Sequence, residues 1–150
     1  IVARGTREVV AIVIDGNNLC YVDKKFIGIA ALRPLCLILQ ESYDVTLVFD
    51  ASIRRLLSGS DDENNWLTDD SLRRRFPGVT LHVVPARSQA DETILAASVD
   101  PFVYVLSNDR FAEFRDKPAV RDKRLIAHEI LNDRVLVHDL DISLTIAPGA

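Results

Sequence analysis

Acidic residues follow several apolar runs of this chain, at points where a turn would need only a polar residue. Asp15 ends the run VVAIVI, Asp50 ends TLVF, and Asp109 closes the SND that follows FVYVL. A further apolar run leads by a short loop to the adjacent acids Asp91 and Glu92. Grouped carboxylates repel one another and raise each other's pKa, whereas Mg²⁺ and Mn²⁺ prefer oxygen ligands. The pattern therefore predicts a divalent-metal site, where the ion activates a water and clamps a phosphoryl oxygen.

Each acid taken alone has a simpler structural interpretation. Asp109 can cap a helix, Asp91 can lie in a first helical turn, and Asp15 can stabilise a loop. Only the shared position after successive strands favours the metal site. A zinc site is not expected, because the three histidines are scattered and Cys20 and Cys36 form no CxxC pair. Both cysteines are interpreted as reduced thiols in the core.

The elements that must position these acids alternate between strand and helix. The expected strands cover residues 9–14, 45–49, 79–84, 102–106 and 134–140. The expected helices cover residues 27–41, 51–57, 66–75, 89–99, 109–116 and 119–132, with a polar loop over 58–65. The last residues, SLTIAPGA, have no clear assignment. This alternation predicts an α/β fold, with a mainly parallel five-stranded sheet between two helical layers. Ligands bind such sheets outside the carboxyl ends of the strands, where the strand order reverses.

Composition places the chain among ordinary globular proteins. Its 150 residues suit a single domain spanning 1–150, and its 48% apolar content allows a real core. No apolar run approaches the length of a transmembrane helix, and no export signal is recognised, so we expect a cytoplasmic protein without a membrane partner. The net charge of −4 argues against nonspecific nucleic-acid binding over the whole surface, although a local basic patch is compatible with it.

Four short motifs resemble the NYN domain, a branch of the PIN-like metal-dependent ribonucleases. They are VIDGNN after the first strand, LVFD ending the second, ADETIL opening a helix, and YVLSNDRF after the fourth strand. The resemblance covers residues 9–116. It implies a three-layer fold of the PIN-like, Rossmann-related type and RNA cleavage that depends on Mg²⁺ or Mn²⁺. The chain departs from the eukaryotic zinc-finger members of the family, because it has no CCCH finger.

Carried onto this sequence, the resemblance assigns roles residue by residue. The implied catalytic set is Asp15, Asn18, Asp50, Asp91 and Asp109. The implied metal ligands are Asp15, Asp91, Asp109 and Glu92, the last standing where several relatives have Asp. The Ser-Asn-Asp motif adds Ser107 and Asn108, and the carboxamide of Asn17 is suited to orienting water or phosphate.

Arginines near these acids are candidate phosphate ligands, because the planar guanidinium can bind two oxygens. Arg54 and Arg55 follow Asp50 by one helical turn, Arg87 precedes the Asp91 helix, and Arg110 adjoins Asp109. Solvated helix faces explain such clusters equally well when each is taken alone. Trp66 stands in the acidic segment SDDENNWLTDD, as a helix anchor or as a base-stacking platform.

The sequence therefore favours a metal-dependent endoribonuclease acting on single-stranded or structured RNA, with a homodimer left open. The alternative is a PIN-like adaptor that binds RNA or protein and has lost cleavage. A phosphatase of the haloacid dehalogenase type would need a second Asp two residues after Asp15, where Asn17 stands. A nucleotide-binding Rossmann domain would need a glycine-rich loop after the first strand, and none is present.

Overall fold

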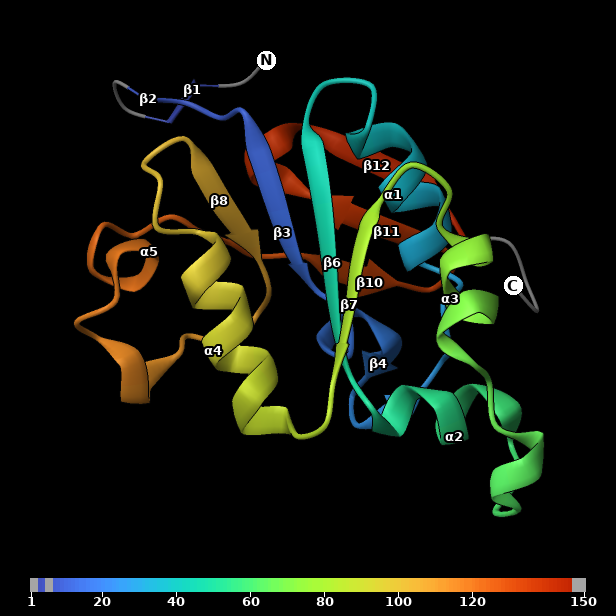
Figure 1. The fold of residues 1–150 in the computed structure, drawn as a ribbon. Coiled ribbons are helices and arrows are strands. Elements are labelled where there is room, and N and C mark those ends of the chain that lie inside the picture. The colour runs from blue at the N-terminus through green and yellow to red at the C-terminus, as the bar shows by residue number, and fades with distance from the viewer. Residues whose placement is uncertain (1–2, 5–6, 147–150) are drawn as a thin grey trace.

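Five parallel strands form the central sheet, in a computed structural model that describes residues 3–4 and 7–146 (Figure 1). The strands are β3 (Ala11–Asp15), β6 (Asp44–Asp50), β7 (Thr80–Val84), β8 (Val103–Leu106) and β9 (Leu125–Ile126). Their spatial order is β7-β6-β3-β8-β9, and every pairing is parallel. The expected α/β architecture with a parallel five-stranded sheet is confirmed.

The strand order reverses between β3 and β8. From β3 the chain builds outward to β6 and β7, and then returns to the other side of β3 as β8 and β9. Ala11 is in register with both Asp44 and Val103, so all three inner strands run together toward the lower edge of the sheet in Figure 1. A reversal of this kind leaves a crevice at the carboxyl ends of the two strands.

Side-chain alternation divides the core between the two faces of the sheet. Ile12 and Ile14 belong to the cluster packed with helix α1 (Leu32–Leu39), whereas Val13 belongs to the cluster packed with helix α4 (Arg87–Ala97). Figure 1 shows α4 on one side of the sheet and α1, together with the C-terminal strands, on the other. Both faces are therefore covered, which explains why β3 is almost wholly apolar.

The outer layers contain short helices and one small sheet. The remaining α-helices are α2 (Ser52–Ser58), α3 (Asp69–Arg75) and α5 (Pro118–Arg121). An antiparallel meander consists of β10 (Glu129–Leu131), β11 (Arg134–Val137) and β12 (Ile142–Thr145). Two small hairpins pair β1 (Ala3–Arg4) with β2 (Arg7–Glu8), and β4 (Tyr21–Val22) with β5 (Lys25–Phe26). The 3₁₀ turns are η1 (Asn18–Cys20), η2 (Glu63–Asn65), η3 (Ala112–Phe114) and η4 (His138–Leu140).

Predictions for the C-terminal third of the chain were largely wrong. The helix expected over 109–116 is reduced to η3, because Phe111 adopts a left-handed backbone with φ of 50° just before it. The helix expected over 119–132 ends after α5, where Lys123 has a φ of 58° and the chain turns into β9. The strand expected over 134–140 is β11, which pairs in the meander and not in the central sheet.

Smaller corrections concern helix ends and the last residues. Helix α4 begins at Arg87, two residues before the expected start, so Asp91 and Glu92 lie beyond its first turn. Pro34 lies in the first turn of α1, where a missing N–H costs nothing. The unassigned tail begins within β12, and residues 147–150 lie outside the described part of the chain. None of the helices in the described ranges has the length and apolar character needed to cross a membrane.

Candidate active site

The crevice between β3 and β8 holds a carboxylate that is almost completely buried. Asp15 is the last residue of β3, and its exposed fraction is only 2%. Because Asp15 is two residues after Val13, its side chain emerges on the face of the sheet that α4 covers. The Ser107 hydroxyl, just past the end of β8, donates a hydrogen bond of 2.8 Å to Asp15 Oδ2. The two strands that flank the reversal are thus joined at their carboxyl ends.

Ser107 also organises the turn that presents Asp109. The backbone N–H of Asp109 donates to Ser107 Oγ at 3.0 Å, and Asp109 Oδ1 accepts from the N–H of Phe111 at 2.7 Å. Asp109 Oδ2 lies on the other side of the carboxyl group and faces Arg87. The Ser107 hydroxyl therefore links the buried carboxylate of Asp15 to the backbone of Asp109, whose own carboxylate is partly exposed.

Four carboxylates share the electrostatic field of this crevice, namely those of Asp15, Asp91, Asp109 and Glu113. The pKa of Asp91 is raised to about 6, chiefly by burial and to a smaller extent by the charges of Asp15, Asp109 and Glu113, against the lowering effect of Arg87. Burial also raises the pKa of Asp15, opposed by the Ser107 hydrogen bond, by Arg87 and by the Asn18 backbone N–H. The charge of Asp109 adds to that increase. Three sequence-predicted acids are thus brought together.

Glu113 was not predicted as a site residue. It stands four residues after Asp109, but no helix relates the two, because the backbone of Phe111 between them is left-handed. Glu113 lines a pocket of about 370 Å³, and the other lining residues are Arg87, Asp91, Asp109, Phe111, Ala112 and Phe114. The pocket opens Asp91, Asp109 and Glu113 of the acid cluster to solvent.

Arg87 is the cation that the structure places within the acid cluster. Its Nε lies 3.9 Å from Asp91 Oδ1, and its Nη2 lies 3.8 Å from Asp109 Oδ2. Both separations are ion-pair distances and exceed the length of a hydrogen bond. Asp91 Oδ1 is buried and has no hydrogen-bond partner. One guanidinium therefore faces two carboxylates without a close bond to either.

Asn18 and Asn108 hold the loops around the crevice. The Asn18 side-chain oxygen accepts from the backbone N–H of Asn108 at 2.9 Å. The Asn108 carboxamide in turn makes two bonds to the backbone of His128, donating to its carbonyl at 2.9 Å and accepting from its N–H at 2.8 Å. Both side chains thus bind protein backbone, and their contacts position the Ser-Asn-Asp turn.

Asp50 lies at the end of β6 but is engaged with the start of α2. Asp50 Oδ1 accepts from the backbone N–H of Ser52 at 2.9 Å and from the Ser52 hydroxyl. Its own N–H donates to the Asn17 side-chain oxygen at 2.9 Å. Asn17 and Asp50 therefore join β3, β6 and α2. The structure does not bring Asp50 into the electrostatic group formed by the other acids.

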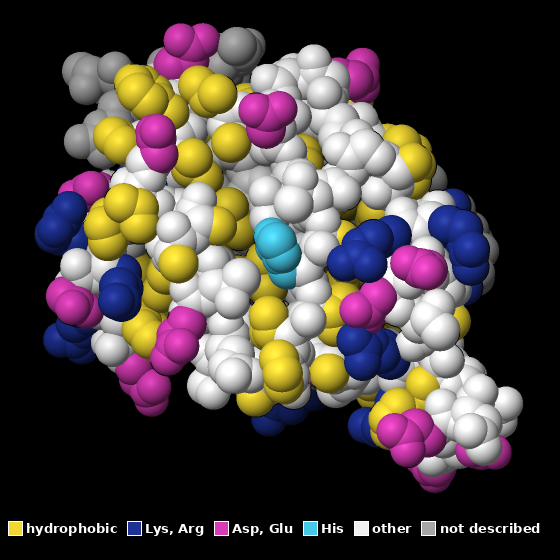
Figure 2. Space-filling model, viewed as in Figure 1, with side chains coloured by type: hydrophobic (Ala, Val, Ile, Leu, Met, Phe, Trp, Pro, Cys, Tyr) yellow, Lys and Arg dark blue, Asp and Glu magenta, His cyan; other side chains and the backbone are white. Residues whose placement is uncertain are grey.

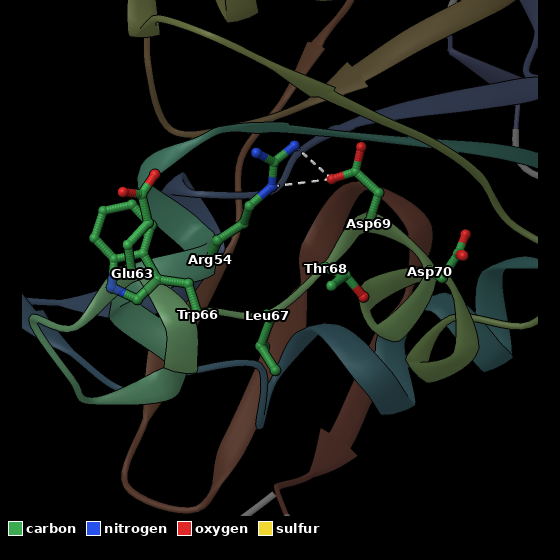
Figure 3. Close-up of a pocket in the computed structure, with 7 residues that line it drawn as sticks. All are labelled: Arg54, Glu63, Trp66, Leu67, Thr68, Asp69 and Asp70. Carbon is green, nitrogen blue, oxygen red and sulfur yellow. Dashed lines mark hydrogen bonds and ion pairs between the residues drawn. The ribbon is translucent and has the colours of Figure 1, made fainter.

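The other predicted ligands are dispersed. Glu92 is exposed on α4, Arg55 is exposed on α2, and Arg110 is exposed beside Asp109. Arg54 is paired with Asp69, whose Oδ1 lies 3.0 Å from Nε and 2.5 Å from Nη2. Figure 3 shows the Arg54 side chain reaching from α2 to Asp69, the first residue of α3.

Trp66 lines the same pocket of about 420 Å³ as Arg54, in company with Glu63, Asp69 and Asp70. Its indole N–H donates to the Ser60 carbonyl at 2.9 Å, which anchors the ring to the loop before η2. Figure 2 shows acidic side chains on the lobe that this loop forms, and elsewhere on that face Lys and Arg are interspersed with Asp and Glu. The surroundings of Trp66 are therefore acidic.

The oxygen atoms of the acid cluster are the type of ligand that hard cations prefer. The cluster offers carboxylate oxygens, one of them buried without a hydrogen bond, and a single guanidinium against four acids. Among the residues that the structure describes, no group of three or more His, Cys, Asp or Glu side chains is arranged to hold a metal ion. Arg87 stands between two of the carboxylates instead.

Comparisons with known proteins give no family assignment. No protein-family model matches the chain, and a search of curated proteins finds no match. The resemblance to the NYN domain therefore rests on the four motifs. Their polar residues lie at the strand ends and on the helix described above.

Proposed function

We propose that the protein is a metal-dependent endoribonuclease whose site is the acid cluster at the carboxyl ends of β3 and β8. The observation that carries the proposal is the convergence of Asp15, Asp91 and Asp109 from three separate elements on the reversal of the strand order. Mutual repulsion and burial oppose this arrangement in folding. A divalent cation would offset the free-energy cost of both, which is a physical reason for these acids to lie together at the carboxyl ends of β3 and β8.

The proposed ligands are the carboxylates of Asp15, Asp91 and Asp109, with Glu113 at the pocket mouth. When bound, Mg²⁺ or Mn²⁺ would supply the Lewis acidity that lowers the pKa of a water and polarises a phosphoryl oxygen. The Ser107 hydroxyl and the Asn18 N–H lower the pKa of Asp15 and so favour the ionised form that would bind a cation. The arginine at the cluster and the opening to solvent support a phosphate-bearing substrate.

The choice of RNA as substrate comes from the motif resemblance and not from a base contact. The adaptor alternative predicts RNA or protein binding at the same surface, without metal-dependent cleavage. A cleavage assay with a labelled single-stranded RNA, and with DNA of the same sequence, separates these possibilities. Reactions are run in EDTA, in Mg²⁺ and in Mn²⁺.

Asp15→Asn is the decisive variant, because the amide keeps the shape of the side chain and removes one negative charge from the crevice. We expect RNA cleavage that requires Mg²⁺ or Mn²⁺ in the wild type and falls at least about a hundredfold in the variant. Asp61→Asn is the matched control, since Asp61 is exposed on the η2 lobe, and it should cleave like the wild type. Circular dichroism and thermal unfolding verify that both variants fold.

Two results would reject the proposal. Cleavage that persists in EDTA, or equally in Asp15→Asn purified in the same way, would remove the acid cluster from the chemistry. RNA binding with no metal-dependent cleavage under any of these conditions would favour the adaptor.

A further inference from the structure

Arg87 occupies an unusual position for a surface arginine. It is the first residue of α4, and its guanidinium lies 3.9 Å from Asp91 Oδ1 and 3.8 Å from Asp109 Oδ2. These two acids come from different elements, so the side chain spans the crevice from the helix to the turn after β8. Its contacts are with the same oxygens that the proposed cation would need.

The two ion pairs of Arg87 are long and exposed to solvent. Neither distance reaches hydrogen-bond length, and 52% of the Arg87 side chain is exposed to solvent. Exposed ion pairs contribute little to stability. The loosely placed guanidinium can therefore leave without breaking a hydrogen bond to either carboxylate.

We infer that Arg87 is a built-in competitor for the cation, holding Asp91 and Asp109 together in the metal-free protein and yielding its place when a divalent ion binds. This inference rests on the proposed function, because it takes the acid cluster as the metal site. A compact ion of charge +2 contacts carboxylate oxygens more closely than a guanidinium at almost 4 Å, so it wins the competition at sufficient concentration. The burial of Asp91 Oδ1 without a hydrogen bond leaves that oxygen open to the exchange.

Displacement gives Arg87 a second role. A half-exposed guanidinium at the mouth of the pocket, released from its carboxylates, is suited to bind a phosphate oxygen of the substrate. Metal binding would then prepare the substrate site as well as the chemistry. Arg87 competes with the metal and then binds substrate in this scheme, so its effect should appear in metal affinity before any cleavage occurs.

Calorimetric titration with Mn²⁺ in the absence of RNA tests the inference. Arg87→Gln removes the competing charge, and we expect it to bind Mn²⁺ about tenfold more tightly than the wild type, which corresponds to about 1.4 kcal/mol. Arg87→Lys keeps a positive charge and should stay close to the wild-type affinity. Arg115→Gln is the matched control, because Arg115 is exposed just after η3 and its replacement changes the net charge of the protein by the same amount.

Thermal unfolding gives a second readout. In EDTA, Arg87→Gln should unfold about 3 °C below the wild type, since the acids lose their nearest cation. In saturating Mn²⁺ the two proteins should unfold at similar temperatures. A variant that binds Mn²⁺ as the wild type does, or more weakly, would overturn the inference, because Arg87 would then not compete with the ion.

The outcomes keep this inference apart from the proposed function. Metal-dependent RNA cleavage with equal Mn²⁺ affinities would refute the role of Arg87 and leave the ribonuclease standing. Tighter Mn²⁺ binding by Arg87→Gln without RNA cleavage would support Arg87 as competitor and reject the ribonuclease. Failure of both proteins to bind Mn²⁺ would reject both.

Discussion

Asp91→Asn should stabilise the metal-free protein, although it removes a proposed metal ligand. Burial, together with the neighbouring acids, raises the pKa of Asp91 from 3.8 to about 6 in the folded protein. At about 1.36 kcal/mol per pKa unit, ionised Asp91 would cost the fold up to about 3 kcal/mol. The side chain is 17% exposed, so relaxation of the solvent around it reduces this cost, and we expect about 1–3 kcal/mol.

The sign of the pH dependence is fixed by the direction of the shift. The folded protein holds the Asp91 proton more tightly than the unfolded chain, so this contribution to stability is fully present below pH 4 and is lost as the pH rises through about 6. The neutral amide of Asp91→Asn does not undergo that loss. The variant's advantage in EDTA should therefore be greatest at pH 7.5 and should vanish near pH 4.

Urea unfolding in EDTA across this pH range measures the effect, and a thermal melt should show an increase of about 3–10 °C at pH 7.5. Glu92→Gln is the control, because Glu92 is the next residue on α4 and is exposed, and its effect should stay within about 0.5 kcal/mol. If Asp91→Asn were no more stable than the wild type at pH 7.5, or if its advantage did not decline toward pH 4, the electrostatic account of the cluster would be wrong. Mn²⁺ should reverse the order, stabilising the wild type more than the variant.

Two further variants test what holds the site in place. Ser107→Ala removes the hydroxyl that donates to Asp15 and accepts from the Asp109 N–H, and it should lower the free energy of unfolding in urea by about 1–2 kcal/mol. Because the pKa of Asp15 rises further without this bond, the acidic limb of the pH–rate profile should move to higher pH. An unchanged acidic limb would show that Ser107 does not influence the reaction. Arg124→Met should cost about 3–5 kcal/mol, because this arginine is 1% exposed and donates to the backbone carbonyls of Ser98, Asp100 and Val103. If Arg124→Met also changed Mn²⁺ affinity, its role would extend beyond the fold.

Four of the five strands of the central sheet could be predicted because they carry a strong signal, whereas β9, which is two residues long, was expected as part of a helix. A strand covered on both faces must be apolar along its length, and β3, β6 and β8 each read as one run that ends in polar residues. The C-terminal meander lacks this signal. Its strands are short, half of their residues face solvent, and the turn between β10 and β11 depends on Asn132 adopting a φ of 54°. The Asn-Asp pair at that turn was the available clue.

The proximity of the acid-cluster residues was predictable where backbone topology alone decides which side chains meet. Parallel strands ending at one rim bring Asp15 and the Ser107–Asp109 turn together, and α4 returns Asp91 to the same face. Whether Asp50 and Arg54 join the acid cluster depends on the direction of their side chains, which cannot be read from their positions in the sequence. Asp50 turns to the amide of Ser52, and Arg54 turns to Asp69.

The polar residues of this rim fall into two groups that differ in what they contact. Asn17, Asn18, Asp50 and Asn108 satisfy backbone groups, and their hydrogen bonds join β3, β6, α2 and the turn after β8. These residues are explained by folding alone. Asp15 and Asp91 are different, because burial raises their pKa values and their neighbours include charges of the same sign.

Folding alone does not favour a buried carboxylate, Asp15, beside a partly buried one, Asp91, since asparagine would fill the same space at lower cost. Ser107 and Arg87 offset part of the cost of Asp15 and Asp91, and neither removes it. A ligand that carries positive charge would offset the remaining cost, and the pocket lined by Arg87 and Glu113 gives such a ligand access. The energetics of the metal-free protein therefore point to the acid cluster, and not to the larger pocket beside Trp66, as the place where chemistry should be sought.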